Sequence, residues 1–258
     1  MVQRDQIIRY LEEVFGRDHL ALSMSIDDYP NGVQFQGSDN VEVVTLGVSC
    51  NEQFLHEAVK RKSTFSIFHH GFDVRTWKSR IPKYSQKRLK LIIENNMTIA
   101  GYHYALDTHK TIGNNAVILR LLGARLKDTL FDSWGFVGSY DVPVRISELR
   151  NKCVKLFNHE VLSFETGKEE VTTIGVVSGG AKPYAEHIAE MEAKGVQVFI
   201  TGESSESAPH RMMESGISYF VCGHYATEVF GVKELGTCIE KKFGNLITVE
   251  YIDIPNVL

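Results

Sequence analysis

The sequence lacks the excess of basic residues that a general nucleic-acid-binding surface requires. It has 28 Lys and Arg residues against 32 Asp and Glu residues, and its formal net charge is −4. This balance excludes a broad basic face. A solvated helix face is the simplest explanation for the local basic run, so we expect no nucleic-acid partner. That run consists of Arg75, Lys78, Arg80, Lys83, Lys87, Arg88 and Lys90.

Long apolar segments and cysteine motifs are also missing. No apolar run is long enough to span a bilayer, and residues 1–6 are polar, unlike the apolar core of a secretory signal. The four cysteines show no CxxC spacing, which argues against a cysteine-rich structural zinc site and favours reduced thiols. We therefore expect a cytoplasmic protein with no membrane partner.

Two parts of the chain carry the same pattern of residues. His103-Tyr104-Ala105-Leu106-Asp107 matches His224-Tyr225-Ala226-Thr227-Glu228 position for position, and each follows an apolar segment typical of a buried strand. Upstream, residues 65–71 align in order with residues 196–202. These matches predict two degenerate copies of a strand-helix-strand-helix-strand unit. Chance similarity between short α/β segments is the alternative explanation.

The repeat predicts an α/β fold of two similar interlocked domains, with the functional site in the cleft between them. We expect the first domain to comprise residues 1–126, joined by the C-terminal strand at 245–258. The second domain is expected at residues 127–244. With 258 residues and 43% hydrophobic content, the chain is long enough to bury a sizeable core.

Polar side chains follow the predicted strands at the points where the strands end, which is the edge where open α/β sheets bind ligands. Imidazoles combined with carboxylates suit Zn²⁺, Fe²⁺, Mn²⁺, Co²⁺ or Ni²⁺ better than Ca²⁺. Two such ions would lower the pKa of water to around 7 and generate a hydroxide nucleophile. Hydrogen-bonded core histidines explain any one pair equally well, but the whole set favours a metal site. The candidates are His69, His70, His103, Asp107, Glu203, His224 and Glu228.

Three further features have two interpretations each. Adjacent residues of a strand point to opposite faces, so His69 and His70 bind one ion only if the strand ends there, and otherwise serve two ions. Glu203 is either a general base or a helix cap. The triplet Ser178-Gly179-Gly180 either presents N–H groups to substrate phosphates or forms a plain turn.

The chain resembles the Nif-three-like family, whose members are named GTP cyclohydrolase I type 2 homologues. The resemblance covers nearly the whole chain. It is carried by Asn31-Gly32-Val33-Gln34, His69-His70-Gly71, His103-x-x-Leu106-Asp107-x-His109, Gly113-Asn114-Asn115-Ala116, Ser178-Gly179-Gly180, Thr201-Gly202-Glu203 and Gly223-His224-Tyr225-Ala226-Thr227-Glu228.

The resemblance implies a dinuclear site of divalent metal ions and a ring-shaped homohexamer. His103 is not a ligand in the family pattern, which leaves it as a catalytic or substrate contact or as a structural histidine. Where many members have an acidic residue after the first strand, this chain has Ser49-Cys50. The ligand set that the resemblance implies is His69, His70, Asp107, His224 and Glu228, with Glu228 bridging the ions.

From the residues and the resemblance together, we expect a metal-dependent hydrolase similar to GTP cyclohydrolase I type 2 that acts on a small-molecule substrate. The metals are two divalent ions, and the sequence does not choose among Zn, Fe, Mn, Co and Ni. The alternative function is a hexameric scaffold or regulatory protein that is stabilised by metal and binds other proteins without catalysis.

Overall fold

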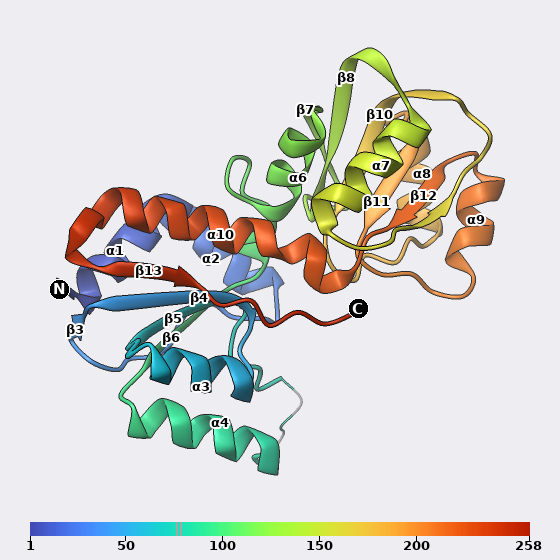
Figure 1. Cartoon of the computed structure of the whole chain (residues 1–258). Coiled ribbons are helices and arrows are strands. Elements are labelled where there is room, and N and C mark those ends of the chain that lie inside the picture. Colours follow the sequence, from blue (N-terminus) through green and yellow to red (C-terminus); the bar gives the residue numbers. More distant parts are fainter. Residues whose placement is uncertain (76, 78) are drawn as a thin grey trace. The chain divides into compact units, whose positions relative to one another are not determined.

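The computed structural model describes residues 1–75, 77 and 79–258. Lys78 of the basic run and Thr76 of the loop expected at residues 72–84 lie outside the described residues. The chain divides into two compact units, and each combines helices with a mixed sheet (Figure 1). Unit 1 contains Met1–Leu106 and Gly231–Ile254, and unit 2 contains Asp107–Phe230 and Pro255–Leu258. The α/β fold class predicted from the sequence is therefore confirmed.

Unit 1 is built on a five-stranded sheet in the order β13-β4-β5-β6-β2, in which only β2 is antiparallel to its neighbour. The three central strands are apolar and buried, as expected for parallel strands covered on both faces. The strands are β2 (Asn31–Phe35), β4 (Val43–Ser49), β5 (Phe65–His70), β6 (Thr98–Tyr102) and β13 (Thr248–Tyr251), and β1 (Val2–Gln3) pairs with β3 (Asn40–Val41).

Helix α3 (Glu52–Lys60) begins at a side-chain cap and buries one face. The side chain of Asn51 accepts a hydrogen bond from the N–H of Phe54, which satisfies one of the unpaired donors at the start of α3. Phe54 and Leu55 on that helix are fully buried, so one face of α3 packs into the core of the unit. The helices are α1 (Arg4–Phe15), α2 (Arg17–Ile26), α3 (Glu52–Lys60) and α4 (Lys83–Glu94).

Unit 2 is built on a six-stranded sheet in the order β7-β8-β10-β11-β12-β9, in which β10, β11 and β12 run parallel. The strands are β7 (Arg125–Leu130), β8 (Gly135–Arg145), β9 (Leu162–Phe164), β10 (Glu170–Val177), β11 (Val198–Thr201) and β12 (Ser218–Val221). The helices are α6 (Asn114–Leu122), α7 (Ile146–Phe157), α8 (Ala185–Ala193) and α9 (Ala208–Glu214). Two helices cross from one unit to the other along the chain, namely α5 (Tyr104–Asp107) and α10 (His224–Phe243).

The repeat predicted from the sequence is present in the topology of the two units. In unit 1 the order β4-α3-β5-α4-β6 gives three adjacent parallel strands, and in unit 2 the order β10-α8-β11-α9-β12 gives three more. Each unit adds antiparallel strands at the sheet edges. The closing strand β13 pairs in parallel with β4, so the chain returns to the first sheet.

The boundaries between the units differ from the expected ones. Unit 1 ends at Leu106 instead of residue 126, because α6 packs its apolar residues against the sheet of unit 2, where Leu119 and Leu122 share a core with Phe136. The second crossing falls at Phe230 instead of residue 244, since the rest of α10 belongs to unit 1. There a Cβ at Gly236 would lie 3.1 Å from a methyl group of Leu46.

Among the described residues, none of the helices is both long and apolar enough to cross a lipid bilayer. The four cysteines are free thiols, and three of them are buried.

Candidate metal centre

His69 and His70 lie at the end of β5, where the alternation of side chains between the two faces of the sheet stops. His70 is the last residue of the strand, so the chain leaves the sheet directly after the pair. The two ring centroids are 4.8 Å apart, and His69 is completely buried. The end of the strand therefore brings two adjacent imidazoles together, which is the first of the two alternatives considered from the sequence.

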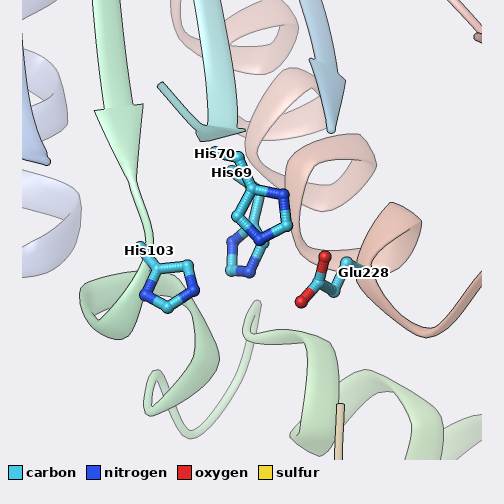
Figure 2. A group of neighbouring side chains, drawn as sticks. All are labelled: His69, His70, His103 and Glu228. Carbon is cyan, nitrogen blue, oxygen red and sulfur yellow. The ribbon is translucent and has the colours of Figure 1, made fainter. Parts of the chain in front are cut away.

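His103 follows β6, the strand next to β5, and brings a third imidazole to the same place. Its ring centroid is 4.7 Å from that of His69 and 5.3 Å from that of His70. One ring nitrogen from each of the three lies within 4.8 Å of the others, so this group could hold a metal ion. Figure 2 shows the three rings beside one another. Glu228, which Figure 2 also labels, belongs to unit 2.

Each of these three imidazoles has its Nδ1 atom in a hydrogen bond within unit 1. Nδ1 of His69 is 3.2 Å from the carbonyl oxygen of Tyr102. Nδ1 of His70 is 3.3 Å from Oγ of Ser49, and Nδ1 of His103 is 2.9 Å from Oδ2 of Asp27. Such contacts fix the orientation of a metal-binding imidazole and select Nε2 as the atom that meets the ion. Ser49, one of the two residues that depart from the family pattern, thus contacts a metal-ligand candidate.

The turn before β2 supports His103. The side-chain oxygen of Asn31 accepts hydrogen bonds from the N–H groups of His103 and Ala105, at 3.0 and 2.9 Å. Burial opposes the charge on Asp27, but the hydrogen bond and positive charge of His103 and further hydrogen-bond donors hold the pKa of Asp27 well below its usual range. Tyr29 stacks on the His103 ring at 4.2 Å. Asn31 and Gly32 are the first two residues of β2.

In unit 2, Asp107 is a buried carboxylate that neighbouring side chains hold in place. Its Oδ1 atom accepts hydrogen bonds from the Asn114 amide at 2.8 Å and from the Ser178 hydroxyl at 3.0 Å. The N–H of Ser178 donates to the side-chain oxygen of Asn115 at 2.7 Å. Ser178 therefore orients Asp107, and its part in substrate binding stays a prediction.

The first turn of α10 carries His224 and Glu228 on one side of the helix. Nε2 of His224 is 3.1 Å from Oε1 of Glu228, whose side chain is only 3% exposed. Nδ1 of His224 is 2.5 Å from Oε1 of Glu203, and Oε2 of Glu203 is 2.9 Å from Nζ of Lys182. His224 therefore follows the same rule as the histidines of unit 1, with Nδ1 bonded and Nε2 turned toward another candidate ligand.

These contacts shift the pKa values of His224 and Glu203 in opposite directions. Burial opposes the charge on His224, but the hydrogen bonds and charges of Glu228 and Glu203 outweigh it and raise the pKa of His224 to about 9. Burial likewise opposes the charge on Glu203, but the hydrogen bonds from Lys182 and His224 hold its pKa below the usual range. Without a metal, His224 is therefore protonated at neutral pH.

A metal ion that binds His224 must displace this proton, so metal affinity should rise with pH. The pKa of His224 is raised to about 9, so competition from the proton persists through neutral pH and ends above that value. We expect the apparent affinity for Zn²⁺ to rise by up to about tenfold per pH unit between about pH 7 and 9 and then to level off. Titration against a competing chelator at fixed ionic strength measures this. A flat profile over that range would contradict the expectation.

The donor set and the backbone around it fit a divalent metal ion. Imidazole nitrogens and carboxylate oxygens are the ligands that zinc and its first-row neighbours prefer. The absence of a side chain at Gly179 leaves room for two candidate ligands, Glu228 and His224. A Cβ at this position would lie 2.3 Å from Oε1 of Glu228 and 3.2 Å from Nε2 of His224. Gly179 also has φ +67°, a backbone conformation that favours glycine. Its N–H donates to Oγ1 of Thr227 at 2.9 Å, which fixes the turn against α10.

Replacing Gly179 by alanine should displace the carboxylate of Glu228. The strained φ should cost about 1–2 kcal/mol of unfolding free energy while the fold persists. The added methyl group should push Glu228 aside and weaken Zn²⁺ binding by at least tenfold, as measured by calorimetric titration. Gly180→Ala is the matched control, since a Cβ there meets nothing closer than 3.7 Å. Equal loss of affinity in both variants would refute this steric explanation.

Several residues that shape the site were missed from the sequence. Asp27 was given no role, and Ser49 was noted only as a departure from the family pattern. Thr227 and Asn115 stood inside quoted motifs without a role. The signal that could have identified Asn31 and Asn115 is their type: an amide side chain both donates and accepts, which suits a residue that ties two loops together.

Known proteins resemble this chain over nearly its whole length. A profile of the family described as Duf34/NIF3 (NGG1p interacting factor 3) matches residues 2–256. A Haemophilus influenzae protein named GTP cyclohydrolase 1 type 2 homolog is 32% identical over 245 residues, which cover 91% of this chain and 93% of that protein.

Solved structures show the same fold over the full length. A structure described as protein ybgI of unknown function has a TM-score of 0.87 at 29% identity, with complete coverage of both chains. The protein TTHA1606 from Thermus thermophilus has a TM-score of 0.83 at 27% identity, again with complete coverage. The family resemblance read from the motifs is therefore confirmed, and the chain belongs to the Duf34/NIF3 (NGG1p interacting factor 3) family.

Proposed function

We propose that this chain is a hydrolase that depends on two divalent metal ions and acts on a small anionic substrate of the GTP type. The ligands are two imidazoles of unit 1 and three side chains of unit 2, and Glu228 bridges the two ions. His103 lies with His69 and His70 in a group of imidazoles that could hold an ion, so it would contact the ions or the reacting groups. The proposed ligands are His69, His70, Asp107, His224 and Glu228.

The main support is the common orientation of four histidines from two units. In each ring Nδ1 is bonded to an oxygen of its own unit, namely of Tyr102, Ser49, Asp27 or Glu203. Core histidines placed only for packing have no reason to share this arrangement, whereas metal-binding histidines require it. The names of the curated relatives point to GTP as the first substrate to test.

The ligand charges favour an anionic substrate. Two carboxylates and three neutral imidazoles do not neutralise two divalent ions, so the occupied site keeps a positive charge that attracts phosphate groups. When bound, such ions supply Lewis acidity and lower the pKa of water toward neutrality. The negative charge of the ligands comes from Asp107 and Glu228. Hydrogen bonds from Asn114 and Ser178 fix the carboxylate of Asp107. Hydrolysis needs no co-reactant other than water.

The test is turnover by protein loaded separately with Zn²⁺, Mn²⁺, Fe²⁺, Co²⁺ or Ni²⁺. The substrates tested are GTP, other nucleotides, amides and phosphate esters. Products are followed by chromatography. We expect metal-dependent hydrolysis of a nucleotide that disappears in metal-free protein and in the His69→Ala variant. The absence of turnover with every metal and substrate would refute the hydrolase proposal.

The resemblance also carries our proposals that the chain assembles as a homohexamer and works in the cytoplasm. Light scattering coupled to size-exclusion chromatography tests the assembly. A stable hexamer that binds metal but turns over no substrate would instead support the scaffold function. The name of the matching family, an interacting factor, is the observation that keeps this second function in consideration.

A further inference from the structure

Four charged or polar side chains of unit 2 form a continuous chain of contacts that ends at the proposed ligands. Nζ of Lys182 is 2.9 Å from Oε2 of Glu203, and Oε1 of Glu203 is 2.5 Å from Nδ1 of His224. On the other side of the ring, Nε2 of His224 is 3.1 Å from Oε1 of Glu228. Both carboxylate oxygens of Glu203 are therefore bonded to side chains of its own unit.

The backbone around Glu203 is fixed as well. Its N–H donates to the carbonyl oxygen of Gly179 at 3.0 Å, and its own carbonyl accepts a hydrogen bond from the Tyr219 hydroxyl at 2.9 Å. Glu203 follows β11, and His224 starts α10 just after β12, the next parallel strand. Two adjacent strand ends thus deliver the carboxylate and the imidazole to each other.

This geometry does not suit a general base. A general base needs a carboxylate oxygen that can take a proton from water or substrate. Both oxygens of Glu203 are held by Lys182 and His224. Lys182 is likewise paired with Glu203.

We propose that Glu203 is a positioning residue for His224, and that Lys182 holds Glu203 in place. Nδ1–H of His224 donates to Glu203, so the ring binds a divalent ion through Nε2, and the negative carboxylate strengthens nitrogen donation to the ion. Carboxylate–histidine–metal arrangements of this kind typically change metal affinity by 10- to 100-fold when the carboxylate is lost. The inference rests on the proposed function only in taking His224 as a metal ligand.

The experiment measures Co²⁺ and Zn²⁺ affinity by chelator competition in Glu203→Ala, Glu203→Gln and Lys182→Met. We expect Glu203→Ala to weaken binding by about 10- to 100-fold. Glu203→Gln should lose less, because its amide oxygen still accepts the hydrogen bond from Nδ1–H, and Lys182→Met should lose least. The visible spectrum of bound Co²⁺ should shift in Glu203→Ala and return toward the wild-type spectrum in Glu203→Gln. Glu206→Ala, which removes an exposed carboxylate from the same loop, is the matched control and should bind as wild type does.

Two outcomes separate this inference from the proposed function. Wild-type affinity and Co²⁺ spectra in both Glu203 variants, with turnover lost, would assign Glu203 as a general base and overturn the inference while leaving the metal site intact. Failure of the wild-type protein to bind Co²⁺ or Zn²⁺ would refute the proposed function and the inference with it. Circular dichroism of each variant verifies that the fold is kept, and Glu203→Gln preserves the test if Glu203→Ala unfolds.

Discussion

Replacing His69 by alanine is expected to lower the affinity for divalent ions about a hundredfold. The apparent binding free energy of a four-ligand zinc site is about 10–16 kcal/mol, so one ligand contributes roughly 3 kcal/mol. His69 is fully buried and lies beside two other imidazoles. Protein purified without chelators or metal-affinity resin should show this as a lower metal content in elemental analysis. His70→Ala should have a similar effect.

The control for these variants is His56→Ala, which removes an exposed histidine from α3 of the same unit. Its metal content should equal that of the wild-type protein. The stability of the metal-free proteins must be compared as well, since the His69 change also leaves a buried void and removes a hydrogen bond to the Tyr102 carbonyl. Unchanged metal content in both His69→Ala and His70→Ala would refute the assignment of these residues as ligands.

The central part of each unit could be predicted from the sequence because the local signals agree there. The segments that became β5, β6 and β12 are short apolar runs, and each is followed by polar residues at the point where the chain leaves the sheet. The repeated pattern at residues 103–107 and 224–228 then placed one copy after each third strand. A continuous apolar run was a sufficient signal in these segments because both faces of the strands are buried.

The domain boundaries could not be predicted because they depend on tertiary packing. The amphipathic pattern of α6 shows that the helix buries one face but does not say against which sheet. The length of α10, which spans His224–Phe243, likewise depends on packing. Glycine lowers helix propensity, and Gly231 and Gly236 lie inside this helix. Packing overrides that penalty, as the close approach of Gly236 to Leu46 shows.

The ligand types of the candidate site could be predicted, but the contacts that orient them could not. Residue chemistry and position after a strand are local features, and they identified the histidines of β5 and α10. The partner of His103 is Asp27, which lies 76 residues earlier in the chain. Spacing carries no information at such a distance, so Asp27 and Ser49 emerged only from the fold.

Replacing Asp27 by asparagine is expected to lower the free energy of unfolding by about 2–4 kcal/mol near neutral pH. The carboxylate, whose side chain is 4% exposed, accepts hydrogen bonds from four donors in unit 1, at 2.9 to 3.0 Å. An asparagine amide offers one accepting oxygen, and its NH₂ group would face other donors, which cannot accept its hydrogens. The donors are the N–H groups of Tyr29 and Tyr104, the Asn31 amide and Nδ1 of His103.

The difference between wild type and Asp27→Asn should depend on pH in one direction. The folded pKa of Asp27 is held below its value in the unfolded chain, about 3.9. The stabilisation is therefore complete above that pH and is lost as the pH falls toward the folded pKa. Urea unfolding followed by circular dichroism between pH 7 and 2.5 should show the two proteins converging in acid. Asp28→Asn, a change at the exposed neighbouring residue, should cost less than about 0.5 kcal/mol. A difference that stays constant across this pH range would show that the effect of Asp27 comes from packing and not from its charge.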